Sequence, residues 1–283
     1  MSNYSKPNDF ILFPYFPQSA FVAEAAASER ICYIFDSNPL VKPMFESEFC
    51  YPSLMGLRNR LQSLKTIAKF PDCGVQKFFN EQTYNEIMAI RLFLEDAPQD
   101  AINPWIRRLC ADSLKPPNPK AELIEYVDIK DSIYKNYKTI FQEADPMKIL
   151  IQHSYKPNFS DKDAFETQFK DKKVPIIYYS PYQINIEEYA AKNFLKMWFF
   201  AITKEDLLDA IPQDETQWVS RCKRDFQFLH KKLDLGGIFY IETHKIEDVS
   251  EFLKIALFYN YKNLHYFENE EGSKVLFLQK PKP

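Results

Sequence analysis

"FILFPYFPQSAFVAEAAASERICYIFD", residues 10–36, decides the fold of this chain. It opens with a short apolar run at 10–16 that is rich in aromatic side chains, which predicts a buried strand. The Ala-rich stretch at 18–30 favours a helix, and "ICYIF" at 31–35 predicts a second strand that ends at Asp36. A strand–helix–strand unit implies two parallel strands, so we expect an α/β fold.

The rest of the chain extends this unit in both helix and strand patterns. Apolar residues recur every three or four positions between 52 and 143, which predicts a helical insertion. We therefore expect one domain over 1–283, with 52–143 as a helical insertion within it. The further predicted elements are strand 147–154, strand 174–180, helix 186–202, helix 215–233, strand 233–243, helix 245–260 and a hairpin at 263–279.

Composition limits the function classes. The chain has 283 residues, a formal net charge of −3 and a hydrophobic fraction of 46%, so it is globular and not a histone-like binder. No apolar run approaches the roughly 18 residues of a membrane span, and the N-terminus lacks a signal-peptide layout. Five cysteines without a CxxC motif, together with four scattered histidines, predict reduced thiols, a cytoplasmic location and no metal site.

Four stretches carry a resemblance to a known family. Three of them read "LFPYFPQSAFVAEAAASERICYIFDSNPL", "YYSPYQINIEEYAAKNFLKMWFF" and "FLHKKLDLGGIFYIET", and the fourth is the helical stretch at 77–117, which is similar to the family's insertion after the first. Their order resembles class I S-adenosylmethionine-dependent methyltransferases. Their landmark residues resemble those of bacterial amino-methylating (adenine-N6 or cytosine-N4) DNA methyltransferases, with degenerate motifs. The resemblance implies a Rossmann-like sheet of seven strands with a C-terminal antiparallel hairpin, and S-adenosylmethionine as methyl donor.

The segment that resembles the donor loop has lost its glycines. The two glycine positions of the family align with Pro17 and Ser19, and the chain has only five glycines in all. Glycine lets backbone N–H groups approach a cofactor closely, whereas proline has no N–H to offer. Asp36 stands where the family's acidic residue binds the ribose hydroxyls, and its alternative role is to cap the turn "DSNP". We therefore expect no cofactor, with S-adenosylmethionine as the alternative.

The segment that resembles the catalytic tip has also changed. The family usually has Ser-Pro-Pro-Tyr here, in which the aromatic ring stacks on a flipped base. This chain has Ser180, Pro181, Tyr182 and Gln183. In one register Gln183 takes the place of the aromatic residue, and in the other one proline is deleted and Tyr182 remains the stacking ring. Ser180, Pro181 and Tyr182 are therefore interpreted as the remnant of a catalytic tip.

One predicted helix carries a run of basic residues. Arg221, Arg224, Lys231 and Lys232 lie on the helix at 215–233, and with Lys170, Lys172 and Lys173 they could form a phosphate-binding surface. The alternative is a solvated helix face.

Damage at both the donor loop and the tip favours a protein without catalysis. We expect a catalytically inactive, DNA-methyltransferase-like protein that acts as a nucleic-acid-binding or scaffolding subunit of a complex. DNA is favoured over RNA, and a protein partner or a second copy of the chain is expected. The alternative is an active DNA or RNA amino-methyltransferase with a remodelled cofactor pocket.

Overall fold

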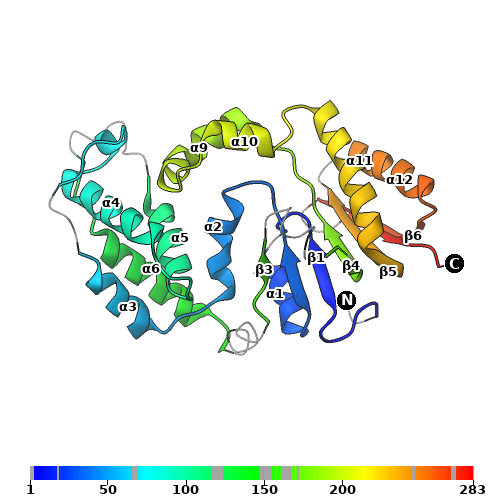
Figure 1. Ribbon diagram of the computed structural model, residues 1–283, viewed down its shortest axis with the longest axis horizontal. Helices are drawn as coiled ribbons and strands as arrows, with labels where there is room; N and C mark the ends of the chain where they lie inside the picture. The colour runs from blue at the N-terminus through cyan, green and yellow to red at the C-terminus, as the bar shows by residue number, and fades with distance from the viewer. Residues whose placement is uncertain are drawn as a thin grey trace. The chain divides into compact units, whose positions relative to one another are not determined.

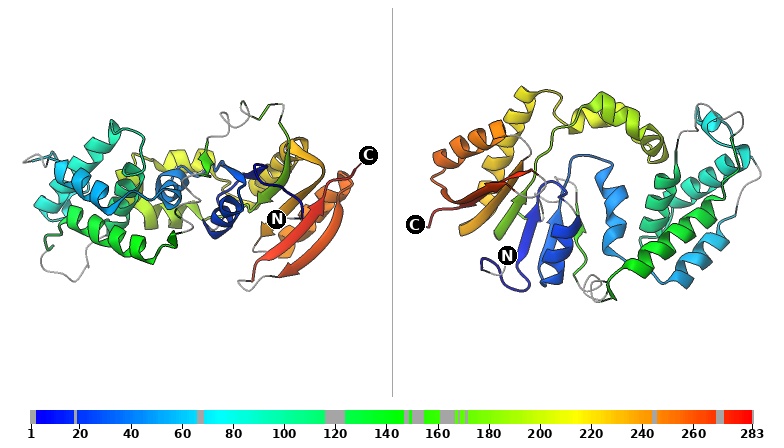
Figure 2. Two further views of the ribbon diagram at one scale, coloured as in Figure 1. Left: turned by 90° about the horizontal axis from the view of Figure 1, so that it is seen from below. Right: turned by 180° about the vertical axis from the view of Figure 1, so that it is seen from behind.

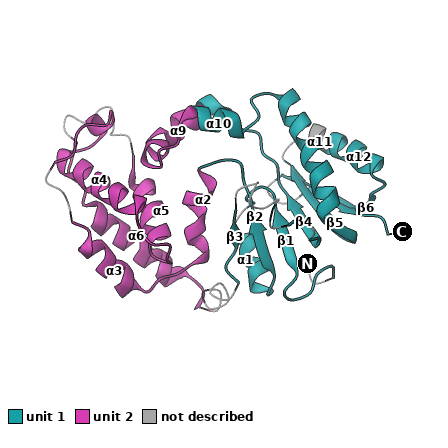
Figure 3. Cartoon of the chain, in the orientation of Figure 1, with its two compact units in different colours: residues 1–39, 150–187, 205–283 teal, residues 40–149, 188–204 magenta. Residues whose placement is uncertain are grey.

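The structure, a computed structural model, describes most of the chain in two compact units. The described residues are 3–17, 19–65, 69–115, 124–146, 149, 155–160, 167, 169–170, 172–243, 246–268 and 272–282. The sheet unit comprises Met1–Pro39, Leu150–Glu187 and Glu205–Pro283, and the helical unit comprises Leu40–Ile149 and Glu188–Lys204 (Figure 3). The insertion predicted at 52–143 lies within the helical unit, and its being part of one domain stays a prediction.

The sheet unit is built on seven strands in the order β3-β2-β1-β4-β5-β7-β6 (Figure 1). Their bounds are β1 Phe10–Phe13, β2 Ile31–Ile34, β3 Asn158–Phe159, β4 Val174–Tyr179, β5 Leu233–Thr243, β6 Lys262–Glu268 and β7 Lys274–Gln279. β1 pairs in parallel with β2 on one side and with β4 on the other, which confirms the predicted parallel unit. β7 runs antiparallel to both β5 and β6, next to the sheet edge. The predicted Rossmann-like class I methyltransferase sheet is therefore confirmed.

Helices cover both faces of this sheet. They are α1 Ser19–Ala27, α11 Glu215–Lys232 and α12 Ile246–Phe258, and the short helix α10 Lys204–Ala210 precedes α11. Phe21 of α1 packs its ring 4.9 Å from that of Tyr178, whereas Phe252 of α12 packs 5.9 Å from Tyr179. Because consecutive strand residues point to opposite faces, α1 lies on one face and α12 on the other.

The helical unit has its own hydrophobic core. Its elements are α2 Val41–Phe45, a 3-10 turn at Glu46–Phe49, α3 Leu54–Ser63, a 3-10 turn at Gln76–Phe78, α4 Glu81–Glu95, α5 Asn103–Ser113, α6 Ile129–Glu143 and most of α9 Ile186–Phe199 (Figures 1 and 2). Trp105 and Tyr137 are fully buried in this core, 4.8 Å apart between ring centroids. Their polar atoms are satisfied, because Trp105 Nε1 donates to the Cys50 carbonyl and Tyr137 Oη donates to that of Pro52. No described residue of this core belongs to the core of the sheet unit.

Several predicted boundaries differ from those observed. The strand predicted at 10–16 ends at Phe13, because Pro14 follows and cannot donate to the ladder. The strand predicted at 147–154 lies outside the described residues, apart from Ile149. Among the described helices, none is long and apolar enough to cross a membrane.

Candidate functional site

The carboxyl ends of β1, β2 and β4 bring the predicted donor acid and the predicted tip together. These three strands are parallel neighbours, so the residues that follow them meet at one edge of the sheet. Asp36 follows β2, and its Oδ2 accepts a hydrogen bond from the Phe16 backbone N–H at 2.9 Å. Its Oδ1 accepts from the Asn38 backbone N–H at 2.8 Å and from the Tyr182 hydroxyl at 2.6 Å. The residue predicted to hold a donor thus bonds to a residue of the tip.

In this structure the Asp36 carboxylate is occupied by hydrogen bonds from its own chain. An acidic residue that binds ribose needs its oxygens to accept from the sugar hydroxyls, and both Asp36 oxygens already accept from this chain. Burial raises the pKa of Asp36, and the hydrogen bonds from Phe16, Tyr182 and Asn38 lower it in part. The bond to Asn38 N–H is the turn-capping role that the sequence offered as the alternative.

Aromatic rings fill the space around Asp36. The ring of Tyr15 lies 5.6 Å from Tyr182 and 5.5 Å from Tyr179, both edge-on. The Tyr15 hydroxyl donates to Asp225 Oδ2 at 2.6 Å, and the Tyr179 hydroxyl donates to the same oxygen at 3.2 Å. Burial, together with the negative charge of Asp225, holds the pKa of Tyr15 well above its ordinary value. These phenols are structural donors in a packed cluster.

The structure shows how the residues of the predicted tip are placed. Pro181 is buried and ends β4, while Ser180 and Tyr182 are partly buried. Tyr182 points inward to Asp36, whereas the Gln183 side chain is exposed. The Tyr182 hydroxyl thus donates to the predicted donor acid, and the stacking role of its ring stays a prediction.

A hollow of about 540 Å³ lies just beyond the tip in the sheet unit. Residues 183–187 line one side of it and residues 212–215 the other. Its described lining includes the carboxylates of Glu187, Asp214 and Glu215 and no basic side chain. Asp214 Oδ1 caps α11 by accepting from the Gln217 N–H at 2.8 Å. An acidic hollow of this kind disfavours the phosphate groups of a nucleic acid.

The four predicted nucleic-acid-binding residues do lie on one helix, α11, but they do not share one surface. Arg224 and Lys231 are exposed, on the same side of the helix. Arg221 is partly buried; it lies over the Tyr15 ring and donates to the Ala210 carbonyl. Lys232 is buried and donates to the carbonyls of Phe169 and Lys170. Two of the four are therefore used inside the protein.

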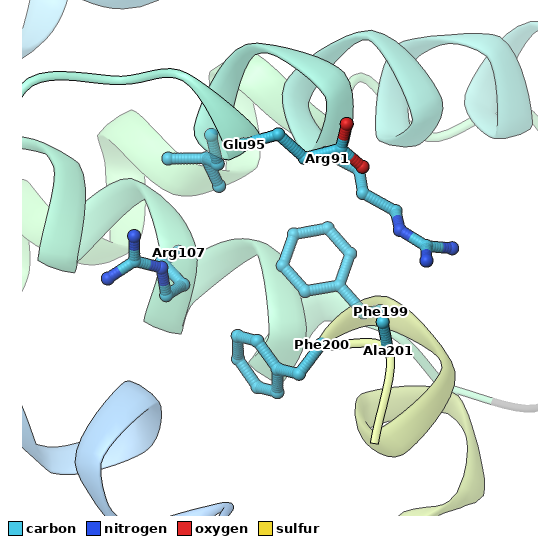
Figure 4. A pocket seen from close by; sticks show the side chains of 7 residues that line it. Arg91, Glu95, Arg107, Phe199, Phe200 and Ala201 are labelled. Carbon is cyan, nitrogen blue, oxygen red and sulfur yellow. The ribbon is translucent and has the colours of Figure 1, made fainter. Parts of the chain in front are cut away.

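The helical unit has a small hollow of its own, of about 160 Å³. Arg91 from α4 and Arg107 from α5 line it together with the rings of Phe199 and Phe200 (Figure 4). The charges of both arginines have local partners, since the Arg91 guanidinium lies 5.1 Å from the centroid of Trp198 and Arg107 lies 4.0 Å from Glu46. The hollow thus has room for about one ring, and the exposed carboxylate of Glu95 also lines it.

One wall of this hollow contains a backbone conformation that is uncommon for its residue. Ala201 has a φ of 54°, which closes α9 with hydrogen bonds from Ala201 N–H to the Trp198 carbonyl and from Ile202 N–H to that of Met197. Glycine is the usual residue at such a left-handed helix end. The sequence analysis singled out none of this hollow's arginines, and their spacing carries no recognisable motif.

Tyr15 and Asp225 are the residues of the sheet-unit site that sequence reasoning missed. They meet across 210 positions of the chain, and neither belongs to a motif that would link them. Among the described residues, no cluster of histidine, cysteine, aspartate or glutamate could hold a metal ion.

The chain was compared with known proteins in three ways. No protein-family model matches it, and no curated protein matches it by sequence. Among solved structures, it is similar to the rRNA methyltransferase aviRa from Streptomyces viridochromogenes, with a TM-score of 0.36 and 7% identity over 98% of this chain and 78% of that chain. A similarity this loose carries no argument about function, so the methyltransferase fold rests on the strand order and on the antiparallel hairpin of the sheet itself.

Proposed function

We propose that this protein is a catalytically inactive, DNA-methyltransferase-like subunit that scaffolds a complex and contacts nucleic acid, DNA in preference to RNA. The observation that carries the proposal is the bond between Tyr182 and Asp36. A donor bound by Asp36 would have to lie between that residue and the tip, and here the two contact each other directly. Pro17 is buried in the loop where the family has a glycine, which supports the same conclusion.

The nucleic-acid part of the proposal has a small basic surface on α11. Arg224 and Lys231 remain as the exposed members of the predicted basic surface on α11. Two positive charges give a weak contact with a phosphate backbone, since each phosphate neutralised steepens the salt dependence of binding by about one unit. The subunit is therefore proposed to bind chiefly through protein contacts.

The test is a titration of the protein with S-adenosylmethionine, followed by calorimetry and by thermal shift. We expect no heat of binding and no stabilisation at millimolar donor. A ligand present at 100 times its Kd would stabilise the fold by about 2.7 kcal/mol. Stabilisation of that order, lost on Asp36→Ala, would refute the proposal.

The second candidate function is an active amino-methyltransferase with a remodelled pocket. The observation that favours it is that an acid and a tip aromatic, Asp36 and Tyr182, are both retained and lie at the same edge of the sheet. It requires Tyr182 to leave Asp36 when the donor binds. Tyr182→Phe would then bind the donor more tightly than the unchanged protein does, because it has no hydroxyl bond to break.

A further inference from the structure

The amino ends of the strands form a surface that the proposed function does not use. α11 ends at Lys232, directly before β5, and α12 ends at Phe258, shortly before β6. β7 is antiparallel to its neighbours, so its last residue, Gln279, lies at the same edge and pairs with Lys262. We call this the amino edge; it lies at the other end of the strands from Asp36 and Tyr182.

Lysines gather along the amino edge. Five exposed lysines lie at or next to the strand ends on this edge, and they are Lys172, Lys173, Lys231, Lys262 and Lys282. The row begins at β1, where Lys172 lies 5.4 Å from the centre of the Phe10 ring, and it ends at β6, which begins at Lys262. It therefore crosses five neighbouring strands. At about 4.8 Å per strand spacing, the row is about 19 Å long.

Local contacts show that lysine side chains at this edge lie close to the backbone and to one another. The Lys282 side chain lies so close over Gly236 that a Cβ there would meet its Cε at 2.5 Å. The buried Lys280 donates to the Leu233 carbonyl at 2.8 Å. Burial, together with the positive charge of Lys173, lowers the pKa of Lys280, and the nearby Asp234 opposes this. The edge therefore carries concentrated positive charge with Asp234 as a counter-charge.

Exposed apolar side chains lie among these lysines. Leu257 and Phe258, at the end of α12, are 71% and 80% exposed, the highest values among the large apolar residues that the structure describes. Leu235, near the start of β5, is 54% exposed. The Phe258 ring contacts Tyr259, whose ring lies tilted, 4.5 Å from that of His230, the neighbour of Lys231. These apolar side chains therefore lie at the same end of the strands as the lysines.

We propose that the amino edge docks on the surface of an anionic lipid bilayer. Lysines alone would bind any polyanion. A phosphate backbone, however, offers no apolar surface for the side chains of Leu235, Leu257 and Phe258. A bilayer surface accepts both, because headgroup charge complements the lysines and Leu or Phe side chains enter the acyl boundary. The acidic hollow beyond the tip then lies at the end of the strands away from the lipid. This inference goes beyond the proposed function and does not depend on whether a donor binds.

The experiment is co-sedimentation of the full chain with vesicles of phosphatidylcholine, with and without about a third phosphatidylserine. We expect binding that requires phosphatidylserine and weakens with salt. Lys173→Gln, Lys262→Gln and Lys282→Gln should each weaken binding about fivefold. Leu257→Ser combined with Phe258→Ser should weaken it at least about tenfold.

Matched controls make the test specific to this surface. Tyr266→Ser combined with Phe267→Ser removes two other exposed aromatics, at 45% and 40% exposure, from further along β6. Lys138→Gln removes an exposed charge from α6. Both should bind vesicles as the unchanged protein does. A Phe258→Trp reporter should shift its emission to the blue on phosphatidylserine vesicles, and a Tyr266→Trp reporter should not.

Three results would overturn the inference. The first is no phosphatidylserine-dependent binding by the unchanged protein. The second is binding that the control variants reduce as much as the amino-edge variants do. The third is a labelled 30-base-pair duplex bound through the lysines while vesicles are not bound, which would make the edge a nucleic-acid surface. None of these results depends on the donor titration, so this inference and the proposed function can fail separately.

Discussion

Removing the Tyr182 hydroxyl tests whether its hydrogen bond to Asp36 stabilises the fold. Tyr182→Phe keeps the ring against Tyr15 and deletes one of three hydrogen bonds to the Asp36 carboxylate. A hydrogen bond to a charged group contributes about 1.5–3 kcal/mol. Because Tyr182 is only partly buried, water reaches Asp36 in the variant, and we expect a loss near the lower limit, about 1.5 kcal/mol. The melting temperature should fall by about 3–6 °C.

The loss should depend on pH in a defined direction. Burial raises the pKa of Asp36 above its ordinary value, so the contribution of Asp36 to stability falls as pH rises through that raised pKa. The Tyr182 bond lowers this pKa in part, and deleting the bond raises it further. The extra loss in Tyr182→Phe should therefore be full at neutral pH and shrink as pH falls below the pKa of Asp36.

The assay is urea unfolding of both proteins at several pH values, with Tyr266→Phe as the matched control. Tyr266 is 45% exposed, so the same chemical change there should alter the free energy of unfolding by no more than about 0.5 kcal/mol. A Tyr182→Phe protein as stable as the unchanged one at neutral pH would refute the reasoning. So would a loss of the same size at every pH, because it would not involve the ionised carboxylate.

Two further predictions follow from the described geometry. Of the five cysteines, Cys73 is exposed and the others are buried, and burial raises the pKa of Cys32 to about 12. A thiol reagent should therefore modify one cysteine rapidly in the native protein and all five in denaturant. Rapid modification of a second cysteine in the native protein would contradict the burial. Ala201→Gly should stabilise the protein by about 0.5–1 kcal/mol, since glycine adopts the left-handed φ of 54° without the Cβ penalty; thermal unfolding would measure the change, and a less stable variant would contradict it.

Local patterns predicted the parallel unit and the hairpin, and the family resemblance implied the seven-stranded sheet. The apolar runs at β1 and β2 with an Ala-rich helix between them require parallel pairing, and the Phe10–Ile31 register confirms it. The hairpin of β6 and β7 was also readable, because its two apolar runs flank a polar turn. What these patterns could not set was the exact end of each strand, where Pro14 and Pro181 decide.

The site was only half predictable, because its decisive contacts join distant residues. The motif placed Asp36 and Tyr182 in separate roles, and their hydrogen bond spans 146 positions of the chain. The basic residues of α11 show the same limit. The sequence analysis assigned Arg221 and Lys232 to a surface because of their charge. In the structure both donate hydrogen bonds inside the protein, Arg221 to the Ala210 carbonyl and Lys232 to the Phe169 carbonyl.

The position of β1 between β2 and β4 has a consequence for folding during synthesis. β1 and β2 leave the ribosome early, but Ile11 of β1 also pairs with Ile176 of β4, which follows residues 40–149 of the helical unit. At about 5–20 residues per second, one side of β1 waits on the order of ten seconds or more for its partner. The entropy of closing that loop is smaller if the intervening helices are already compact. Slow or damaged folding of the helical unit should therefore leave an apolar strand edge open to mispairing, even though no side chain of β1 is changed.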